Sequence, residues 1–332
     1  MRTTLLAICF LFASCSGKPD HPRVRIATAS TGLQIQNMPT TLAYALGYYK
    51  EEGLDVALEN LSSNTKTLQA LIGGSVDAAG IVYSQSIQIA AEGQRVRTFF
   101  ILNRRVTNVL VVAPAATGRI RRAEDLKGAL IGVPAHGSPN QLWLNYYLAA
   151  HGVLPSEFRT VGIGLGASAF AAIESGRINA ASVSGGDHLH LLRRHPAMRI
   201  LADASTPGGM LETYGDSAFA GNALSAKQEW LVRNPDTARR LARALKRTLR
   251  WIASHTPEEI RERLPESFRS QDKEMDLAVI RWGCAMYTAD GAMPKGAPEA
   301  MKRYLDATVD NVRNAKIDLG ATWTNEFLPE AK

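Results

Sequence analysis

The sequence contains little cysteine. Its three cysteines among 332 residues are Cys9, Cys15 and Cys284. Cys9 and Cys15 lie in an N-terminal segment with the features of an export signal, so only Cys284 belongs to the expected folded part and no internal disulfide bond is possible there. A chain of this length can bury a sufficient core without disulfides. We therefore interpret Cys284 as a packing residue on a helix rather than a reactive thiol.

The apolar run at the N-terminus is too short to cross a bilayer. Residues 5–12 supply roughly half of the ~20 residues that a spanning helix needs. Small Ala13 and Ser14 precede Cys15 and resemble the lipobox of bacterial lipoproteins, although Phe12 stands where leucine is usual. We expect residues 1–15 to be a lipoprotein signal peptide ending at lipidated Cys15, with 16–22 as a tether. An ordinary signal peptide with an incidental cysteine is the alternative, and both predict export to the periplasm or cell surface.

The chain also lacks a strong excess of charge of either sign. Removing residues 1–14 removes one basic side chain, Arg2, and no acid, which leaves 37 basic against 31 acidic residues. Arginine pairs such as Arg193-Arg194 and Arg239-Arg240 lie on helical stretches between apolar positions. No basic stripe is interleaved with aromatic residues, so we expect no nucleic-acid partner, and the charge fits a solvated face near an anionic membrane.

Short β-branched or alanine-rich runs alternate with amphipathic segments from Val24 onward, which predicts an α/β fold with mostly parallel strands. After Gly221 we expect helices only, several with proline near their starts. The strands are predicted at 23–28, 54–58, 77–82, 97–102, 108–113, 129–133, 159–163, 179–183, 198–203 and 216–221.

One long-range repeat indicates two similar lobes. Residues 70–79 match residues 172–181, with Gly74 and Gly176 in register, and each copy reads as a helix with a glycine C-cap followed by a strand of small residues. Upstream, residues 37–42 match 137–142, each with a proline just inside a helix start. Ligands of parallel α/β lobes bind beyond the carboxyl ends of the strands, so two facing lobes would enclose a cleft.

Ordered motifs over most of the chain resemble a known family. They are Leu42–Val56 with its Gly-Tyr-Tyr-Lys-Glu-Glu-Gly-Leu-Asp-Val stretch, Gly74–Ala79, Ala123–Gly128, Ile131–Val133, Gly137-Ser138 and Gly176–Ala180. The chain is similar to the NMT1/THI5-like, SsuA/TauA-like substrate-binding proteins of ABC transporters, the nitrate, sulfonate, taurine and thiamine-precursor group. The resemblance implies a type 2 periplasmic-binding-protein fold, with 23–108 plus 216–332 as lobe 1, 109–215 as lobe 2, and a hinge of two crossings.

The sequence departs from these relatives in two places. Sulfonate and taurine binders resemble each other in an aromatic residue near the stretch that here reads Ser184-Gly185-Gly186-Asp187, and none is present. The thiamine-precursor enzymes carry a cysteine-rich segment that this chain lacks. These departures leave more than one class of ligand to consider, and they do not change the expected fold.

Candidate ligand residues lie at helix starts and at the ends of strands. Helix N-termini suit an anionic or strongly polar group. Ser138 could cap its helix, contact a ligand, or do both. We interpret Asp187 first as an N-cap for 188–195 and second as a partner for a ligand amino group. Tyr214 is either a residue that stacks on or hydrogen-bonds to a ligand, or a buried hinge tyrosine. The expected ligand residues are Asn37, Met38, Tyr83, Ser84, Gln85, Ser138, Asn140, Gly185, Asp187 and Tyr214.

Other chemistries are not favoured. His188 and His190 are two residues apart, which does not bring them onto one helical face, so we expect no metal. Residues 162–166, Gly-Ile-Gly-Leu-Gly, lack the rest of a dinucleotide fingerprint and are interpreted as a strand-to-helix turn, with no cofactor expected.

We expect a monomeric, non-enzymatic solute-binding lipoprotein that works with an ABC permease and ATPase. The expected ligand is a small organic anion or zwitterion of the sulfonate or taurine kind, with a thiamine-precursor pyrimidine or aromatic acid as the alternative. A ligand-sensing lipoprotein that reports to a membrane receptor and, last, a pyrimidine-synthesis enzyme on the same fold are the other classes.

Overall fold

The structure is a computed structural model that describes residues 21–30, 32–184, 186–214 and 219–330. The expected signal peptide, Cys15 with its expected lipid, most of the expected tether and Gly185 lie outside the described residues. Within the described ranges, no helix combines the length and the apolar composition that crossing a membrane would require.

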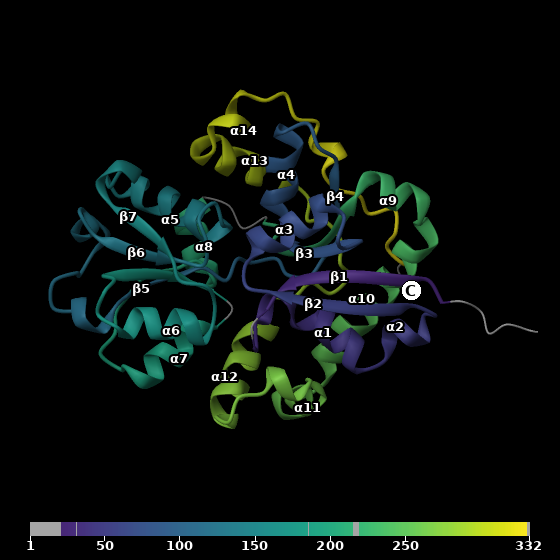
Figure 1. The fold of residues 1–332 in the computed structure, drawn as a ribbon, viewed down its shortest axis with the longest axis horizontal. Helices are drawn as coiled ribbons and strands as arrows, with labels where there is room; N and C mark the ends of the chain where they lie inside the picture. Colours follow the sequence, from purple (N-terminus) through teal and green to yellow (C-terminus); the bar gives the residue numbers. More distant parts are fainter. Residues whose placement is uncertain (1–20, 31, 185, 215–218, 331–332) are drawn as a thin grey trace, which may run out of the picture.

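Two five-stranded sheets form two lobes, as the repeat predicted (Figure 1). The first sheet has the order β2-β1-β3-β10-β4 and the second β7-β6-β8-β5-β9. In each sheet the first three strands are parallel, and the fourth runs antiparallel to both of its neighbours. The strands are β1 (Arg23–Ala29), β2 (Asp55–Leu61), β3 (Ala78–Val82), β4 (Val96–Ile101), β5 (Val109–Val112), β6 (Leu130–Val133), β7 (Arg159–Gly162), β8 (Ala180–Val183), β9 (Ile200–Asp203) and β10 (Asn222–Lys227).

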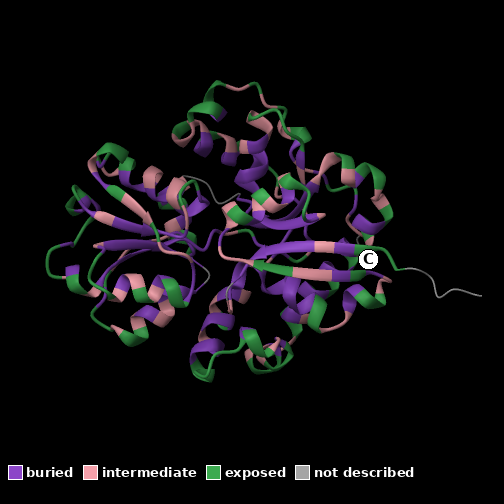
Figure 2. Cartoon of the chain, in the orientation of Figure 1, coloured by how far each residue is buried: buried purple, intermediate pink, exposed green. Residues whose placement is uncertain are grey.

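Helices cover both faces of each sheet. The first sheet is covered by α1 (Met38–Ala45), α2 (Tyr48–Glu51), α3 (Asn64–Gly73), α4 (Tyr83–Ala91), α9 (Gln228–Arg233) and α10 (Pro235–Ser254). The second sheet is covered by α5 (Pro139–Ala150), α6 (Ala167–Glu174), α7 (Asp187–Arg194) and α8 (Pro207–Tyr214). Figure 2 shows the buried sheets inside and the exposed positions on the outer helix faces.

The alternation of side chains along β5 shows how the second lobe is packed. Leu110 and Val112 belong to the cluster that includes Trp143 of α5. Val109 and Val111 face the opposite cluster, which contains residues of α6 and α7. This period of two directs the alternate side chains of β5, which is buried along its whole length, to the helices on both faces of the sheet.

The repeat identified in the sequence is present in the structure. Gly74 ends α3 and Gly176 follows α6, with φ angles of 77° and 72°. Each then leads into the equivalent strand, β3 or β8. Only glycine adopts this left-handed conformation without strain, so the matching glycines mark the same turn in both lobes.

Two expectations about the later part of the chain were wrong. The strand predicted at 216–221 lies at Asn222–Lys227, so strands do not stop at Gly221. It forms because β3 and β4 supply hydrogen-bonding partners on both edges and bury its small side chains. The helix α8 was also not anticipated.

The C-terminal helices pack on lobe 1 and reach toward lobe 2. They are α11 (Pro257–Arg263), α12 (Lys273–Cys284), α13 (Ala297–Thr308) and α14 (Asp310–Asn314). α12 contacts α7, and α13 packs against both α4 and α5. Cys284 ends α12, and burial raises the pKa of its thiol to about 11, which keeps it protonated.

Candidate functional site

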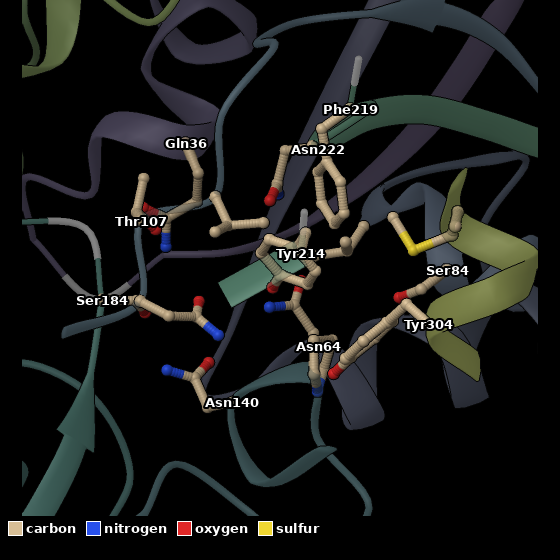
Figure 3. Close-up of a pocket in the computed structure, with 16 residues that line it drawn as sticks. Gln36, Asn64, Ser84, Thr107, Asn140, Ser184, Tyr214, Phe219, Asn222 and Tyr304 are labelled. Carbon is tan, nitrogen blue, oxygen red and sulfur yellow. The ribbon is translucent and has the colours of Figure 1, made fainter. Parts of the chain in front are cut away.

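A cavity lies between the two lobes, beyond the carboxyl ends of their central strands (Figure 3). It comprises about 470 Å³ of space not filled by atoms, part of it open to solvent. Lobe 1 contributes Gln36, Asn64, Val82, Ser84, Asn222, Met301 and Tyr304; the remaining wall is formed by Val106, Thr107, Asn108, Pro139, Asn140, Ser184, Tyr214, Phe219 and Gly221. Its position between two lobes, at the carboxyl ends of their strands, is where α/β proteins of this kind bind small ligands.

Three helices begin at the cavity wall. Asn64 is the first residue of α3, Ser84 the second of α4 and Asn140 the second of α5. The N–H groups of a first helical turn have no partner within the helix, and the helix dipole makes this end positive. The converging helix starts therefore favour an anionic or electron-rich group of a ligand.

No residue that lines the cavity within the described part of the chain carries a charged side chain. Among the lining residues the polar groups are amides of asparagine and glutamine and hydroxyls of serine, threonine and tyrosine. Burial raises the pKa of Tyr214 and of Tyr304 well above its ordinary value, so both phenols are neutral. The described lining residues can therefore recognise a ligand through hydrogen bonds, helix ends and aromatic surface.

Aromatic side chains close one side of the cavity. Tyr214 of α8 stacks on Tyr146 of α5, with ring centroids 6.2 Å apart. Tyr304 of α13 meets both rings edge-on, at 5.1 Å from Tyr214 and 5.0 Å from Tyr146. Phe219 lies 4.4 Å from Tyr214. Because α13 packs against α4 on the first sheet and against α5 on the second, this cluster joins the lobes.

The opposite side of the interface is joined by polar contacts. Asp187 accepts a hydrogen bond of 3.0 Å from Gln34 Nε2, and Trp282 Nε1 donates to Ser205 Oγ at 3.2 Å. The imidazole of His188 packs edge-on against Trp282, with centroids 5.0 Å apart. With both sides of the cleft bridged, the lobes are in a closed arrangement.

Three of the ten predicted ligand residues line the cavity: Ser84, Asn140 and Tyr214. Gln85 lies behind the wall, where its Nε2 donates to the Asn64 carbonyl at 3.5 Å. Ser138 caps α5 by accepting from Gln141 N, which confirms the predicted cap. It does not line the cavity.

Gly185 lies outside the described residues, and the remaining predicted residues do not line this cavity. Asn37 is buried behind Asn222, and its Oδ1 accepts a hydrogen bond from Asn222 Nδ2 at 3.4 Å. Met38 is part of a hydrophobic core, because its helix presents it to α12. Tyr83 is also buried, with its hydroxyl 2.6 Å from Thr322 Oγ1.

The N-cap expected at Asp187 is wrong. Gly186 occupies the N-cap position of α7, and the Asp187 side chain makes no capping bond there. Its carboxylate instead accepts from Gln34 Nε2 and from Gly166 N, at 3.0 and 3.2 Å. Asp187 lines a second, more open cavity with His190, so it does not meet a ligand in the first one.

Several cavity residues were not anticipated from the sequence. Gln36 precedes the first helix, Asn64 starts α3, and Asn222 starts β10. Asn64 could have been found, because Ser63 before it is an N-cap that marks a helix start just after β2. Thr107, Asn108, Phe219 and Tyr304 carry no sequence signal that separates them from ordinary loop or helix residues.

No group of three or more histidine, cysteine, aspartate or glutamate side chains that could hold a metal occurs within the described ranges. His188 is buried against Trp282, and burial lowers the pKa of His188 to about 4. The glycines at 164 and 166 have φ angles of 72° and 57° and lead directly into α6. They form the strand-to-helix turn that was expected.

Solved structures share this architecture. A protein of Bordetella bronchiseptica RB50 is 30% identical with a TM-score of 0.85, covering 92% of this chain and 95% of that one. The alkanesulfonate-binding protein SsuA from Xanthomonas axonopodis pv. citri, solved with MOPS bound, has a TM-score of 0.69 at 16% identity and covers 93% and 99%. The second likeness shows the periplasmic-binding-protein fold.

Curated sequences give two kinds of relative. The candidate binding protein YtlA of Bacillus subtilis (strain 168) is 22% identical over 272 residues, 81% of this chain and 78% of that protein. The 4-amino-5-hydroxymethyl-2-methylpyrimidine phosphate synthase THI13 of Saccharomyces cerevisiae is 22% identical over 225 residues, 65% of this chain and 63% of the synthase. A family model described as NMT1/THI5 like matches residues 34–260, and the chain belongs to this family.

Proposed function

We propose that this protein is the extracytoplasmic solute-binding component of an ABC importer, which captures one small polar organic molecule by closure of its two lobes. The observation that carries the proposal is the cavity between the lobes, walled by uncharged polar groups from both of them. The fold shared with the alkanesulfonate-binding protein SsuA supports this role. In such a role the lobes deliver the ligand to a permease and ATPase.

We infer that the ligand carries an anionic or electron-rich group held by the starts of α3, α4 and α5. Helix ends can bind such a group without a cationic side chain. Asn64, Ser84 and Asn140 at these starts add hydrogen-bonding groups to the wall. A small organic anion or zwitterion of the sulfonate or taurine kind fits this arrangement.

A pyrimidine or other aromatic ligand is the second candidate. The wall contains Tyr214, Phe219 and Tyr304, which offer faces and edges for stacking. The fungal relatives are synthases of a phosphorylated pyrimidine. An uncharged, hydrogen-bonding wall beside aromatic rings suits a flat heterocycle.

We propose binding rather than catalysis. Among the described residues, the lining contains no histidine, cysteine, lysine, aspartate or glutamate to act as a nucleophile or as a general acid and base. Export, the lipid anchor at Cys15 and a monomeric state belong to the same proposal, because an importer's binding component works outside the cytoplasmic membrane. A sensory lipoprotein would use the same cavity and differ in its membrane partner.

A ligand screen tests the proposal. Purified protein is titrated by calorimetry and thermal shift with taurine, alkanesulfonates, nitrate, aromatic acids and aminopyrimidines, because a ligand of the folded state raises the melting temperature. We expect one compound class to bind at one molecule per chain, with no change in the compound recovered afterward. Chemical turnover of the ligand would contradict the binding role, and absence of binding by every class would contradict the proposed ligand.

A further inference from the structure

Two chains of hydrogen-bonded amides end at the cavity wall. The first begins at Asp187, which is 4% exposed at the lobe interface and accepts from Gln34 Nε2 at 3.0 Å and from Gly166 N at 3.2 Å. An ionised carboxylate accepts hydrogen bonds and cannot donate them. Asp187 therefore determines which end of the Gln34 amide faces it.

The orientation of Gln34 determines that of Gln36. With its Nε2 directed at Asp187, Gln34 has its Oε1 available, and Gln36 Nε2 donates to this atom at 3.1 Å. The oxygen and nitrogen of an amide side chain are assigned from such a network, and here the carboxylate fixes the assignment. The remaining amide atom of Gln36 is its carbonyl oxygen, an acceptor.

The second chain begins at a backbone carbonyl. Asn37 Nδ2 donates to the Ala29 oxygen at 3.2 Å, and its Oδ1 accepts from Asn222 Nδ2 at 3.4 Å. The amide nitrogen of Asn222 is thereby directed to Asn37. Asn222 lines the cavity and is left with its carbonyl oxygen, so both chains end in the same way.

The acceptor at the end of the first chain needs a donor. Gln36 is 2% exposed and lines the cavity, and its Oε1 has no hydrogen-bond partner in the described part of the chain. Asn64 Oδ1, on the same wall, is likewise buried without a partner among those residues. Figure 3 shows Gln36 and Asn140 entering the site from opposite sides. A buried acceptor is costly unless a bound molecule supplies an N–H or O–H group.

We propose that Asp187, through Gln34, holds Gln36 as a hydrogen-bond acceptor, and that the site consequently selects a ligand with an N–H donor. This inference rests on the proposed solute-binding function and narrows its ligand. Amino-bearing molecules satisfy it, whether an aminosulfonate zwitterion or an aminopyrimidine. Nitrate and plain alkanesulfonates have no donor at neutral pH and leave Gln36 and Asn64 unpaired.

Asp187 and Gln34 are positioning residues in this scheme, since neither lines the cavity. The contact between Asp187 and Gln34 also crosses from lobe 2 to lobe 1, so the acceptor is fixed when the lobes are closed. The donor group of the ligand thus meets an acceptor whose orientation is fixed by closure of the lobes. The other end faces the positive helix starts.

Paired ligands test the selection. Affinities are measured for taurine against ethanesulfonate, and for an aminopyrimidine against the same ring without its amino group. We expect at least about tenfold tighter binding of the amino member of the pair that binds, because the donor-free member leaves a buried acceptor unpaired. Equal affinities within both pairs would overturn the inference while the solute-binding function stands, and no binding in either pair would overturn both.

Three variants separate positioning from general damage. Gln36→Met removes the acceptor, Asp187→Asn removes the group that orients it, and Gln94→Met changes an exposed glutamine away from the cavity. We expect the affinity ratio within a ligand pair to approach one in the first variant, to fall in the second and to stay unchanged in the third. A structural defect would weaken both ligands together and leave their ratio unchanged, which would overturn the scheme.

The relay is also testable without ligand. In side-chain amide NMR spectra, the signals of Gln34 and Gln36 should both shift in Asp187→Asn, while that of Gln94 should not. A Gln36 signal insensitive to Asp187→Asn would show that the two residues are not connected. This readout does not depend on the identity of the ligand, so it fails or succeeds independently of the solute-binding function.

Discussion

The carboxylate of Asp187 and the amide of Gln34 are joined across the lobe interface by a hydrogen bond of 3.0 Å, between residues 153 positions apart in the sequence. The contact buries a carboxylate that would be hydrated in separated lobes. Its neighbour in sequence, His188, is buried in the same interface against Trp282. Two adjacent ionisable residues thus lose their hydration together.

Asp187 and His188 should contribute to stability with opposite pH dependence. Burial raises the pKa of Asp187 to about 6, opposed by the hydrogen bonds from Gly166 and Gln34. The contribution of Asp187 to stability is present below about pH 4, the pKa of an aspartate in the unfolded chain, and is lost as the pH rises through 6. Burial lowers the pKa of His188 to about 4, so its contribution is present above about 6.5 and is lost as the pH falls through 4.

Single variants should reveal these opposing slopes. In Asp187→Asn we expect the free energy of unfolding to increase from pH 4 to 6.5, and in His188→Gln to decrease from pH 4 to 6. Each change amounts to about 3 kcal/mol, from roughly 1.4 kcal/mol per unit of pKa shift. Urea denaturation across this range measures both, and parallel profiles in the two variants would contradict the assignment.

Removal of the Tyr304 side chain should impair closure. Tyr304→Ala deletes two edge-on contacts with lobe 2, and each such aromatic pair is worth about 0.5–1.5 kcal/mol beyond its buried area. We expect about tenfold weaker ligand binding and a larger radius of gyration in X-ray scattering with ligand present. Tyr44→Ala, at a tyrosine that is 52% exposed, is the matched control. Equal effects of the two changes would remove Tyr304 from the closing contacts.

Gly80 and Gly73 should respond to alanine with opposite signs. A Cβ at Gly80 would lie 2.5 Å from Asn37 Oδ1, the atom that accepts from Asn222, whereas one at Gly73 meets nothing within 4 Å. We expect Gly80→Ala to destabilise by about 1–3 kcal/mol and to weaken ligand binding. Gly73→Ala, on helix α3, should stabilise by about 0.4–1 kcal/mol. Thermal and urea unfolding measure both changes in stability. Unaltered ligand binding by Gly80→Ala would show that Asn37 does not affect the site.

Ser138→Ala should act mainly on stability. Its hydroxyl accepts from Gln141 N and is 1% exposed, so its loss should cost about 1 kcal/mol of unfolding free energy, as for other N-caps. Thr256→Ala removes the equivalent cap of α11, far from the cavity, and should cost a similar amount. Ligand affinity should fall little in either variant. A tenfold loss confined to Ser138→Ala, with stability intact, would show a direct contact with ligand.

Most of the architecture could be predicted because it depends on local patterns. The β-branched and alanine-rich runs marked nine of the strands, and the glycines at 74 and 176 marked equivalent helix ends. β10 was displaced because Asn222–Lys227 contains no β-branched or aromatic residue and owes its conformation to the strands on either side. The position of β10 therefore depends on tertiary contacts and not on a pattern in its own residues.

The site was less predictable because its partners are distant in sequence. The chemistry of Asp187 is set by Gln34, and an aspartate before a helix has the same local pattern whether it caps that helix or turns away. Asn37 was predicted to contact the ligand. It lies close to the cavity but behind its wall, because its side chain contacts Asn222. Helix starts identified the edge of the cleft, and the side chains that reach into it depend on how the lobes meet.

The placement of β10 bears on the order in which the protein can fold. All strands of the second sheet lie between Val109 and Asp203, so that sheet can assemble from one continuous stretch of chain. The first sheet cannot, because β10, between β3 and β4, arrives only after the whole second lobe has been made. Pairings between distant segments form slowly. During synthesis, the first sheet therefore stays incomplete, with the edges of β3 and β4 that pair with β10 unpaired, until the whole second sheet has been made.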